Sequence, residues 1–89
     1  MALISKDNTL DWVLRLLDKM PVSSLIEIQS YKRNRTITVF KEEVYFQVSE
    51  NGFWNQEFQA KREELKSLLK KLIKREFPRS HKLWVFKGK

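Results

Sequence analysis

Apolar residues between positions 8 and 20 recur at the three- and four-residue spacing of an amphipathic helix. The residues that form this stripe are Leu10, Val13, Leu14 and Leu17. Asn8 is placed to cap the first turn, and Pro21 ends the helical pattern near Met20. We therefore expect a first helix over residues 8–20.

From residue 24 onward the spacing of apolar residues changes to two, which is typical of strands with one buried face. The alternating residues are Ile26, Ile28, Ile37, Val39, Val44, Phe46 and Val48. The polar segments 32–35 and 41–42 interrupt the alternation and suit hairpin turns. The pattern predicts three antiparallel strands.

These turns also predict a register. The turn at 32–35 would set Ile28 opposite Val39, and the turn at 41–42 would set Val39 opposite Val44. Both pairings produce one apolar face across the three strands, which a register shifted by one residue would not. We expect the helices to cover this face.

The loop around Gly52 decides which side chains of the next strand are buried. A two-residue turn would bury Glu57. A three-residue loop with a left-handed glycine, at residues 50–52, would instead bury Trp54 and Phe58. Burying aromatic rings costs far less than burying a carboxylate without a partner, so we predict the bulged loop.

A second apolar stripe at helical spacing spans residues 61–76 and ends before Pro78. Acidic residues occupy its first turn and basic residues its last, which suits the helix dipole. Residues 82–87 then alternate again and predict a fifth strand. The sequence thus predicts one small α+β domain over residues 1–89. Its elements follow the order α-β-β-β-β-α-β, with a mainly antiparallel sheet of four to five strands and both helices on one face.

Positive charge is concentrated in the last third of the chain. The formal net charge is +7, and residues 61–89 carry 11 Lys and Arg against three acidic residues. Such a one-sided basic segment favours a polyanionic partner. The candidate phosphate-binding residues in this region are Lys66, Lys70, Lys71, Lys74, Arg75, Arg79 and Lys82.

Several of these residues are like-charged neighbours on one helix face. Lys66 and Lys70, and again Lys70 and Lys74, are four residues apart, and each such pair costs about 0.2–0.5 kcal/mol in an isolated helix. A face selected only for solubility would mix acids with bases. An ordinary solvated helix face is the alternative interpretation.

The first hairpin turn adds a second basic cluster of Lys32, Arg33 and Arg35. A protruding basic turn could reach a nucleic-acid backbone, and the alternative is a turn that only keeps the protein soluble. The turn gains functional weight only if the fold sets it beside the other basic residues.

Aromatic residues gather on the outer face of the predicted sheet. They are Tyr31, Phe40 and Tyr45, joined by Phe53 if the bulged loop forms. Such rings can stack on unpaired bases, at about 1–3 kcal/mol per base. The alternative is that these rings pack against each other across strands or form a subunit interface. We favour this alternative because the face is not itself strongly basic.

No motif indicates catalysis, a metal or a cofactor. The chain has no cysteine and one histidine, His81, so it cannot assemble a Cys/His metal site. No stretch resembles a signal peptide or approaches the ~20 apolar residues of a membrane span. We expect a cytoplasmic protein that is not an enzyme and does not enter membranes.

Two families share parts of this layout. The order helix, three strands, helix resembles the double-stranded-RNA-binding domain, and residues 70–74 resemble its KKxxK signature. In that family these lysines begin the last helix, whereas here they lie inside it. A strand meander followed by an amphipathic helix is equally similar to the single-strand-binding transcriptional coactivators. Neither likeness of layout assigns a family.

The leading interpretation is a small basic protein that binds DNA or RNA through the second helix, with single and double strands both open. The alternative is a protein-interaction module or homodimer that uses the outer aromatic face or the last strand.

Overall fold

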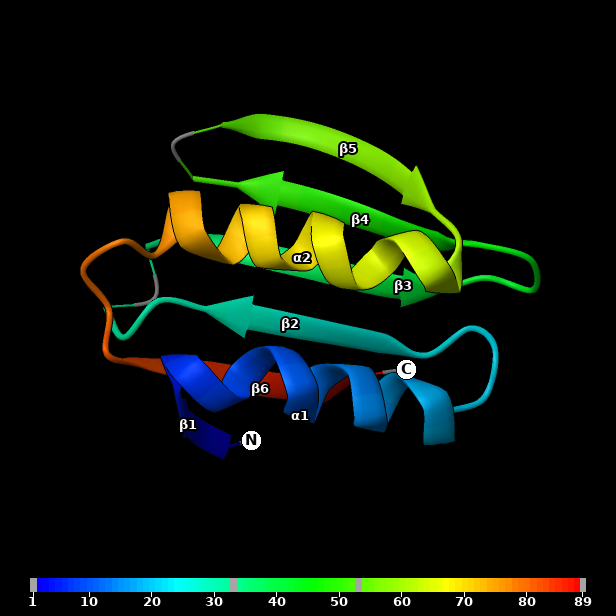
Figure 1. The fold of residues 1–89 in the computed structure, drawn as a ribbon, viewed down its shortest axis with the longest axis horizontal. Helices are drawn as coiled ribbons and strands as arrows, with labels where there is room; N and C mark the ends of the chain where they lie inside the picture. The colour runs from blue at the N-terminus through cyan, green and yellow to red at the C-terminus, as the bar shows by residue number, and fades with distance from the viewer. Residues whose placement is uncertain (1, 33, 53, 89) are drawn as a thin grey trace.

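The computed structural model describes residues 2–32, 34–52 and 54–88. Over these residues the chain forms six strands and two helices (Figure 1). In chain order they are β1 (Ala2–Ser5), α1 (Lys6–Lys19), β2 (Leu25–Gln29), β3 (Thr36–Lys41), β4 (Phe46–Asn51), β5 (Asn55–Ala60), α2 (Arg62–Glu76) and β6 (Lys82–Gly88).

The strands form one sheet in the order β1-β6-β2-β3-β4-β5, and every neighbouring pair is antiparallel. Both helices lie on the same face of this sheet (Figure 1). The predicted α+β class and the antiparallel sheet are confirmed. The predicted strand number was wrong, because β1 precedes the first helix and raises it to six. β1 has only four residues, too few for a clear period-two pattern.

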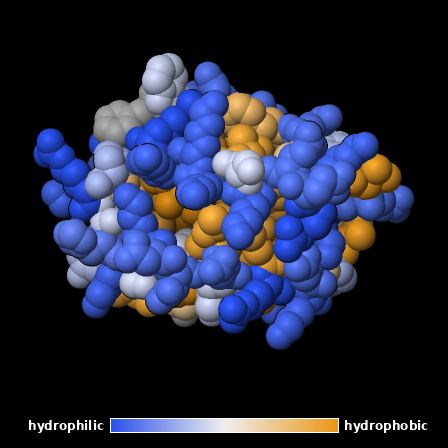
Figure 2. Space-filling model, in the orientation of Figure 1, coloured by the Kyte–Doolittle hydropathy of each residue, from blue (hydrophilic) through white to orange (hydrophobic). Residues whose placement is uncertain are grey.

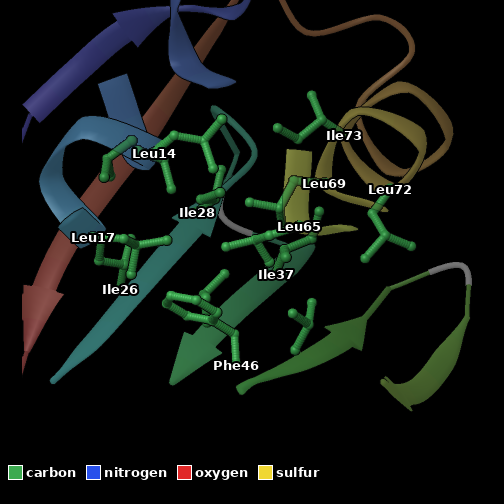
Figure 3. Packing of buried hydrophobic residues seen from close by; sticks show 14 of the residues in the cluster. Leu14, Leu17, Ile26, Ile28, Ile37, Phe46, Leu65, Leu69, Leu72 and Ile73 are labelled. Carbon is green, nitrogen blue, oxygen red and sulfur yellow. The ribbon is translucent and has the colours of Figure 1, made fainter. Parts of the chain in front are cut away.

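The core fills the space between the helices and the sheet (Figure 3). Alternate sheet residues point into it, as the period-two pattern predicts. Phe77, directly after α2, is also fully buried. The fully buried apolar side chains are Val13, Leu17, Ile26, Ile28, Ile37, Val39, Val48, Leu65, Leu69, Leu72, Phe77 and Leu83.

The predicted strand registers were wrong, although the predicted buried face was largely right. Ile28 lies opposite Ile37, and Val39 lies opposite Val48, so the two pairings are displaced by two and four residues. The β2–β3 turn is centred one residue earlier in the chain than predicted, and the β3–β4 turn is centred two residues later. An even displacement keeps each side chain on its own face. Val44 falls in the longer β3–β4 loop and is 78% exposed rather than buried.

α1 begins at Lys6, so the predicted cap at Asn8 was wrong. β1 leads directly into the helix, and the backbone N–H of Lys6 donates to the His81 carbonyl at 2.8 Å. The buried Thr9 hydroxyl donates to the Ser5 carbonyl at 2.8 Å. Pairing of β1 with β6 therefore sets where the helix starts.

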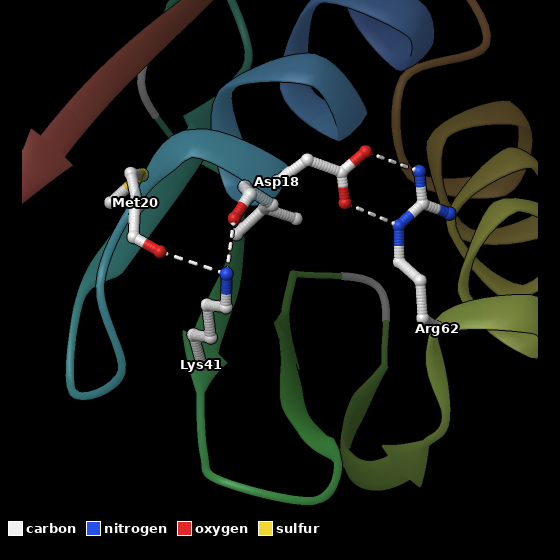
Figure 4. Close-up of polar contacts among 5 residues, drawn as sticks. Asp18, Met20, Lys41 and Arg62 are labelled. Carbon is white, nitrogen blue, oxygen red and sulfur yellow. Dashed lines mark hydrogen bonds and ion pairs between the residues drawn. The ribbon is translucent and has the colours of Figure 1, made fainter.

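Two side chains fix the other end of α1 (Figure 4). Lys41 Nζ donates to the carbonyl oxygens of Leu17 and Met20, at 2.7 and 2.8 Å. The Arg62 guanidinium meets both carboxylate oxygens of Asp18, at 2.7 and 2.9 Å. The first contact joins α1 to β3 and the second joins it to α2.

The β4–β5 loop has three residues, as predicted, but it consists of residues 52–54 rather than 50–52. Gly52 does not adopt a positive φ, so the predicted left-handed bulge is wrong. Phe58 lies opposite Val48 and packs against the core, whereas Trp54 is half exposed. Phe53, expected on the outer face, lies outside the described residues.

Candidate nucleic-acid interface

Two segments far apart in the sequence line an open hollow of about 510 Å³ at one end of the sheet. They are the β2–β3 turn and the loop from α2 to β6, which both lie at the left of Figure 1. The lining residues are Ser30, Tyr31, Lys32, Asn34, Arg35, Arg79, Ser80, His81 and Lys82.

The first wall is held by hydrogen bonds within the β2–β3 turn. The buried Ser30 hydroxyl donates to Asn34 Oδ1 at 2.8 Å, and the Ser30 N–H donates to the Arg35 carbonyl at 3.1 Å. Arg35 Nη1 reaches the Glu76 carbonyl at 3.4 Å and so connects the turn to the C-terminal end of α2. The turn is therefore fixed at both its base and its side.

The second wall is held by hydrogen bonds to the backbone carbonyl of Phe77, a fully buried residue. The Ser80 N–H donates to the Phe77 carbonyl at 3.3 Å, and Lys6 Nζ donates to the same carbonyl at 2.6 Å. The His81 carbonyl accepts the backbone N–H of Lys6. These contacts tie the loop to the start of α1, so Arg79 and its neighbours project from an anchored backbone.

Pairing of β2 with β6 brings the two walls together. Gln29 of β2 lies opposite Trp84 of β6. Trp84 Nε1 also donates to the carbonyl of Tyr31, two residues after Gln29, at 3.1 Å. The rings of Tyr31 and Trp84 are stacked, with centroids 6.2 Å apart and planes 18° apart. A contact between residues 53 positions apart thus sets the geometry of the hollow.

The hollow is positively charged. Lys32, Arg35, Arg79 and Lys82 line it, and no acidic residue does so among the residues described. Among the described residues, no acidic group forms an ion pair with Lys32, Arg79 or Lys82. Four of the predicted phosphate-binding residues therefore lie together. Arg33, a fifth, lies outside the described residues.

A second basic surface lies on the helix layer. Lys66, Lys70, Lys71 and Lys74 are exposed on α2, as predicted, and Figure 2 shows hydrophilic side chains over most of this face. Lys70 and Lys74 border a groove of about 290 Å³ between the two helices. Because α2 leads directly into the second wall of the hollow, the two surfaces follow each other along the chain.

Arg75 is placed differently from the lysines of α2. Its guanidinium makes two hydrogen bonds to the fully buried Glu50 carboxylate, with Nε 2.8 Å from Oε2, and it lies 5.2 Å from the centre of the Trp54 ring. Burial opposes ionisation of Glu50, but the hydrogen bonds from Arg75 and with Glu76 outweigh it and lower its pKa. Arg75 is thus an ion-pair partner of the sheet.

The sequence interpretation missed this buried cluster. Glu50 and Glu76 are both fully buried, and the backbone N–H of Trp54 donates to Glu76 Oε2 at 3.2 Å. One signal was available, because Glu50 continues the period-two alternation of Phe46 and Val48. The predicted loop 50–52 took Glu50 out of the strand because it kept the Glu57 carboxylate away from the core. In the structure, α2 supplies Glu50 with a partner, Arg75.

The three candidate aromatic residues do not form one surface. Tyr31 lies at the hollow and is 61% exposed. Phe40 pairs with Leu25 and Gln47 inside the sheet and is half-buried. Tyr45 belongs to the β3–β4 loop at the opposite end of the sheet (Figure 1).

Among residues 2–32, 34–52 and 54–88, no three His, Cys, Asp or Glu side chains gather closely enough to hold a metal ion. Neither helix in this part of the chain is long and apolar enough to cross a membrane. No family model, curated protein sequence or solved structure matches the chain.

Proposed function

We propose that the protein is a non-enzymatic nucleic-acid-binding protein and that the basic hollow holds backbone phosphates. One observation carries this proposal. Four basic side chains from two distant segments line one open hollow, with no acidic residue among the described lining residues. A polyanion is the partner that such a surface complements.

The chemistry of the lining suits phosphate. Arg79 offers a guanidinium that can donate two parallel hydrogen bonds to phosphate oxygens, and Lys32 and Lys82 add ammonium charges. Because both walls are anchored by backbone hydrogen bonds, little main-chain ordering is required on binding. Release of counterions from the nucleic acid then supplies most of the affinity.

The lysines of α2 extend the proposed footprint. Bound phosphates would relieve the repulsion among Lys66, Lys70, Lys71 and Lys74, which have no ion-pair or hydrogen-bond partner among the described residues. Arg33 lies outside the described residues and is included in the proposed footprint from its place in the sequence alone. Arg75 is not counted as a phosphate contact, because Glu50 already occupies its guanidinium.

Binding to random oligonucleotides over a salt series tests the proposal. The parent should bind at low salt, and log K should fall with log salt by about 0.7 to 0.9 per phosphate contacted. The double variant Arg79→Glu/Lys82→Glu should bind more weakly and with a smaller slope. The matched control Arg15→Glu/Lys19→Glu changes the net charge equally on exposed residues of α1 and should stay close to the parent.

A second pair, Lys70→Glu/Lys74→Glu, measures the contribution of α2. If it flattens the salt slope as much as the hollow variant, both surfaces contact phosphates. Absence of low-salt binding by the parent would contradict the proposal. So would equal losses in the hollow variant and in the α1 control, because the effect would then be one of net charge alone.

A homodimer or protein-interaction module is the second candidate. The helices lie on one face of the sheet, and the opposite face carries the half-buried apolar side chains Leu25, Phe40 and Phe86. Sedimentation at several protein concentrations tests it, since a dimer should show a concentration-dependent mass. A constant monomer mass would remove the homodimer.

A further inference from the structure

We infer that the hollow takes single-stranded nucleic acid, with an unpaired base stacked on Tyr31. This inference rests on the proposed function and names the substrate class of the same site. It is carried by the exposed ring of Tyr31, which lines the basic hollow and is stacked on the half-buried Trp84.

Tyr31 is held as a platform rather than as a loose surface ring. Tyr31 is two residues after Gln29, the last residue of β2, so its side chain lies on the same face as that of Gln29. This is the outer face of the sheet, which the helices leave open. Trp84 stacks against it, and Trp84 Nε1 donates to its carbonyl. The Tyr31 side of the pair is still 61% exposed. A ring fixed in this way loses little entropy when a base stacks on it.

Cationic residues flank this platform. Lys32 follows Tyr31 in the chain, and Lys82 precedes Trp84 by two residues on the same face of β6. Arg79 lines the hollow opposite the turn. A single strand alternates phosphates with bases that can unstack, and this surface places cations beside an aromatic ring in the same way.

The outer face next to the platform is polar. Gln29 lies opposite Trp84 of β6 and opposite Thr36 of β3. The side chains of Gln29 and Thr36 lie on the same face of the sheet as Tyr31. Their amide and hydroxyl groups can hydrogen-bond the edges of a splayed base. A duplex keeps its bases stacked and paired, so it could use the cations of the hollow but neither Tyr31 nor these groups.

The volume of the hollow agrees with this occupant. Its 510 Å³ falls within the range of about 300–1,000 Å³ of sites that hold small organic ligands. The extended, unpaired backbone of a single strand can turn one nucleotide into such a space. The sequence disfavoured base stacking on the outer face because that face carries few basic residues. In the structure, the neighbouring turn and loop place basic residues beside Tyr31, so stacking on this ring becomes the favoured interpretation.

Affinity for a homopyrimidine oligonucleotide of roughly 12 nucleotides, and for a duplex of the same length, tests the inference. The parent should bind the single strand more tightly than the duplex at the same salt. Tyr31→Ala should weaken single-strand binding by roughly 5- to 150-fold, the range for one stacked base, and leave duplex binding and the salt slope unchanged.

Two matched variants control for loss of an aromatic residue. Tyr31→Phe keeps the ring and should keep the affinity. Tyr45→Ala removes a tyrosine at the opposite end of the sheet and should bind like the parent. Circular dichroism should show all three variants folded, since the substituted side chains are at least partly exposed.

Fluorescence supplies a readout at the site itself. Trp12 and Trp54 are 40% and 50% exposed, so the variant Trp12→Phe/Trp54→Phe should remain folded with Trp84 as its only tryptophan. Single-stranded oligonucleotide should quench Trp84, because the base would stack on the Tyr31 ring that packs against Trp84. Duplex should quench it much less.

Equal affinity for both strand forms, or an unchanged single-strand affinity in Tyr31→Ala, would overturn the inference. Either result would leave the proposed function standing if Arg79→Glu/Lys82→Glu still weakened binding. Absence of binding to both strand forms at low salt would overturn both.

Discussion

The Arg75 guanidinium holds the Glu50 carboxylate through two parallel hydrogen bonds, although Glu50 is completely removed from solvent. Arg75 is on α2 and Glu50 is on β4, so the pair ties the helix layer to the sheet. Glu50 is acceptable in the core because the Arg75 guanidinium hydrogen-bonds both of its carboxylate oxygens.

Removing Arg75 should destabilise the fold. Arg75→Ala leaves a buried carboxylate without its cation, so we expect a loss of about 3 kcal/mol or more in the free energy of unfolding. Urea denaturation measures it, with Lys71→Ala, an exposed residue of the same helix, as the control. At salt concentrations where Arg75→Ala is folded, its nucleic-acid salt slope should equal the parent's. A slope lower by one phosphate contact would show that Arg75 binds nucleic acid after all.

The same pair predicts a dependence of stability on pH. The pKa of Glu50 is lowered in the folded state from its ordinary value of 4.5, so its stabilising contribution is present above that pH and is lost as the pH falls through the folded pKa. The difference in unfolding free energy between the parent and Glu50→Gln should stay constant above about pH 5 and shrink at lower pH. Denaturant titrations at several pH values would contradict this if the difference did not change in acid.

Gly52 should tolerate no side chain. A Cβ there would overlap Glu76 Oε1 and approach Arg35 Cγ to 2.9 Å. Glu76 is fully buried, and its Oε2 accepts a hydrogen bond from the Trp54 backbone N–H. We expect Gly52→Ala to cost about 1–3 kcal/mol, the range for overpacking. Gly88→Ala is the matched control, because its Cβ would meet Leu25 at an ordinary 3.5 Å. Equal thermal stability of the two variants would show that the β4–β5 loop can shift.

Lys41 should stabilise α1 from a distance. Its ammonium group donates to two carbonyl oxygens at the C-terminal end of the helix, where a positive charge also suits the helix dipole. Lys41→Met keeps the apolar stem and removes the charge, and we expect a loss of about 1–2 kcal/mol in unfolding free energy. Lys66→Met, which removes an exposed charge from α2, should change stability little. Hydrogen exchange should show the loosening of Lys41→Met in the last turn of α1.

Sequence periodicity predicted every helix and every strand except β1. It failed on register, because Val44 fits a period-two pattern equally well as a strand residue or as part of a longer loop. The choice between such loops depends on which strand register buries the most favourable set of side chains. Val48, and not Val44, lies opposite Val39, since this register also brings Phe58 of β5 onto the core.

The candidate site was predictable in composition but not in arrangement. Charge counting found Lys32, Arg79 and Lys82 as separate residues of two segments. Their convergence depends on the pairing of β2 with β6, a contact between strands far apart in the chain that local patterns do not encode. The burial of Glu50 was missed for the same reason, because its partner is supplied by α2.

The place of β6 in the sheet has a consequence for synthesis on the ribosome. β6 comes last along the chain, yet it lies between β1 and β2. Among the residues described, β1 pairs only with β6, and the backbone N–H of Lys6 at the start of α1 donates to the carbonyl of residue 81. A nascent chain can therefore form the contiguous β2–β5 meander with α2 early, while β1 and the start of α1 wait for residues 81–88 to emerge from the exit tunnel. Insertion of β6 between β1 and β2 then joins β1 and the start of α1 to the rest of the sheet.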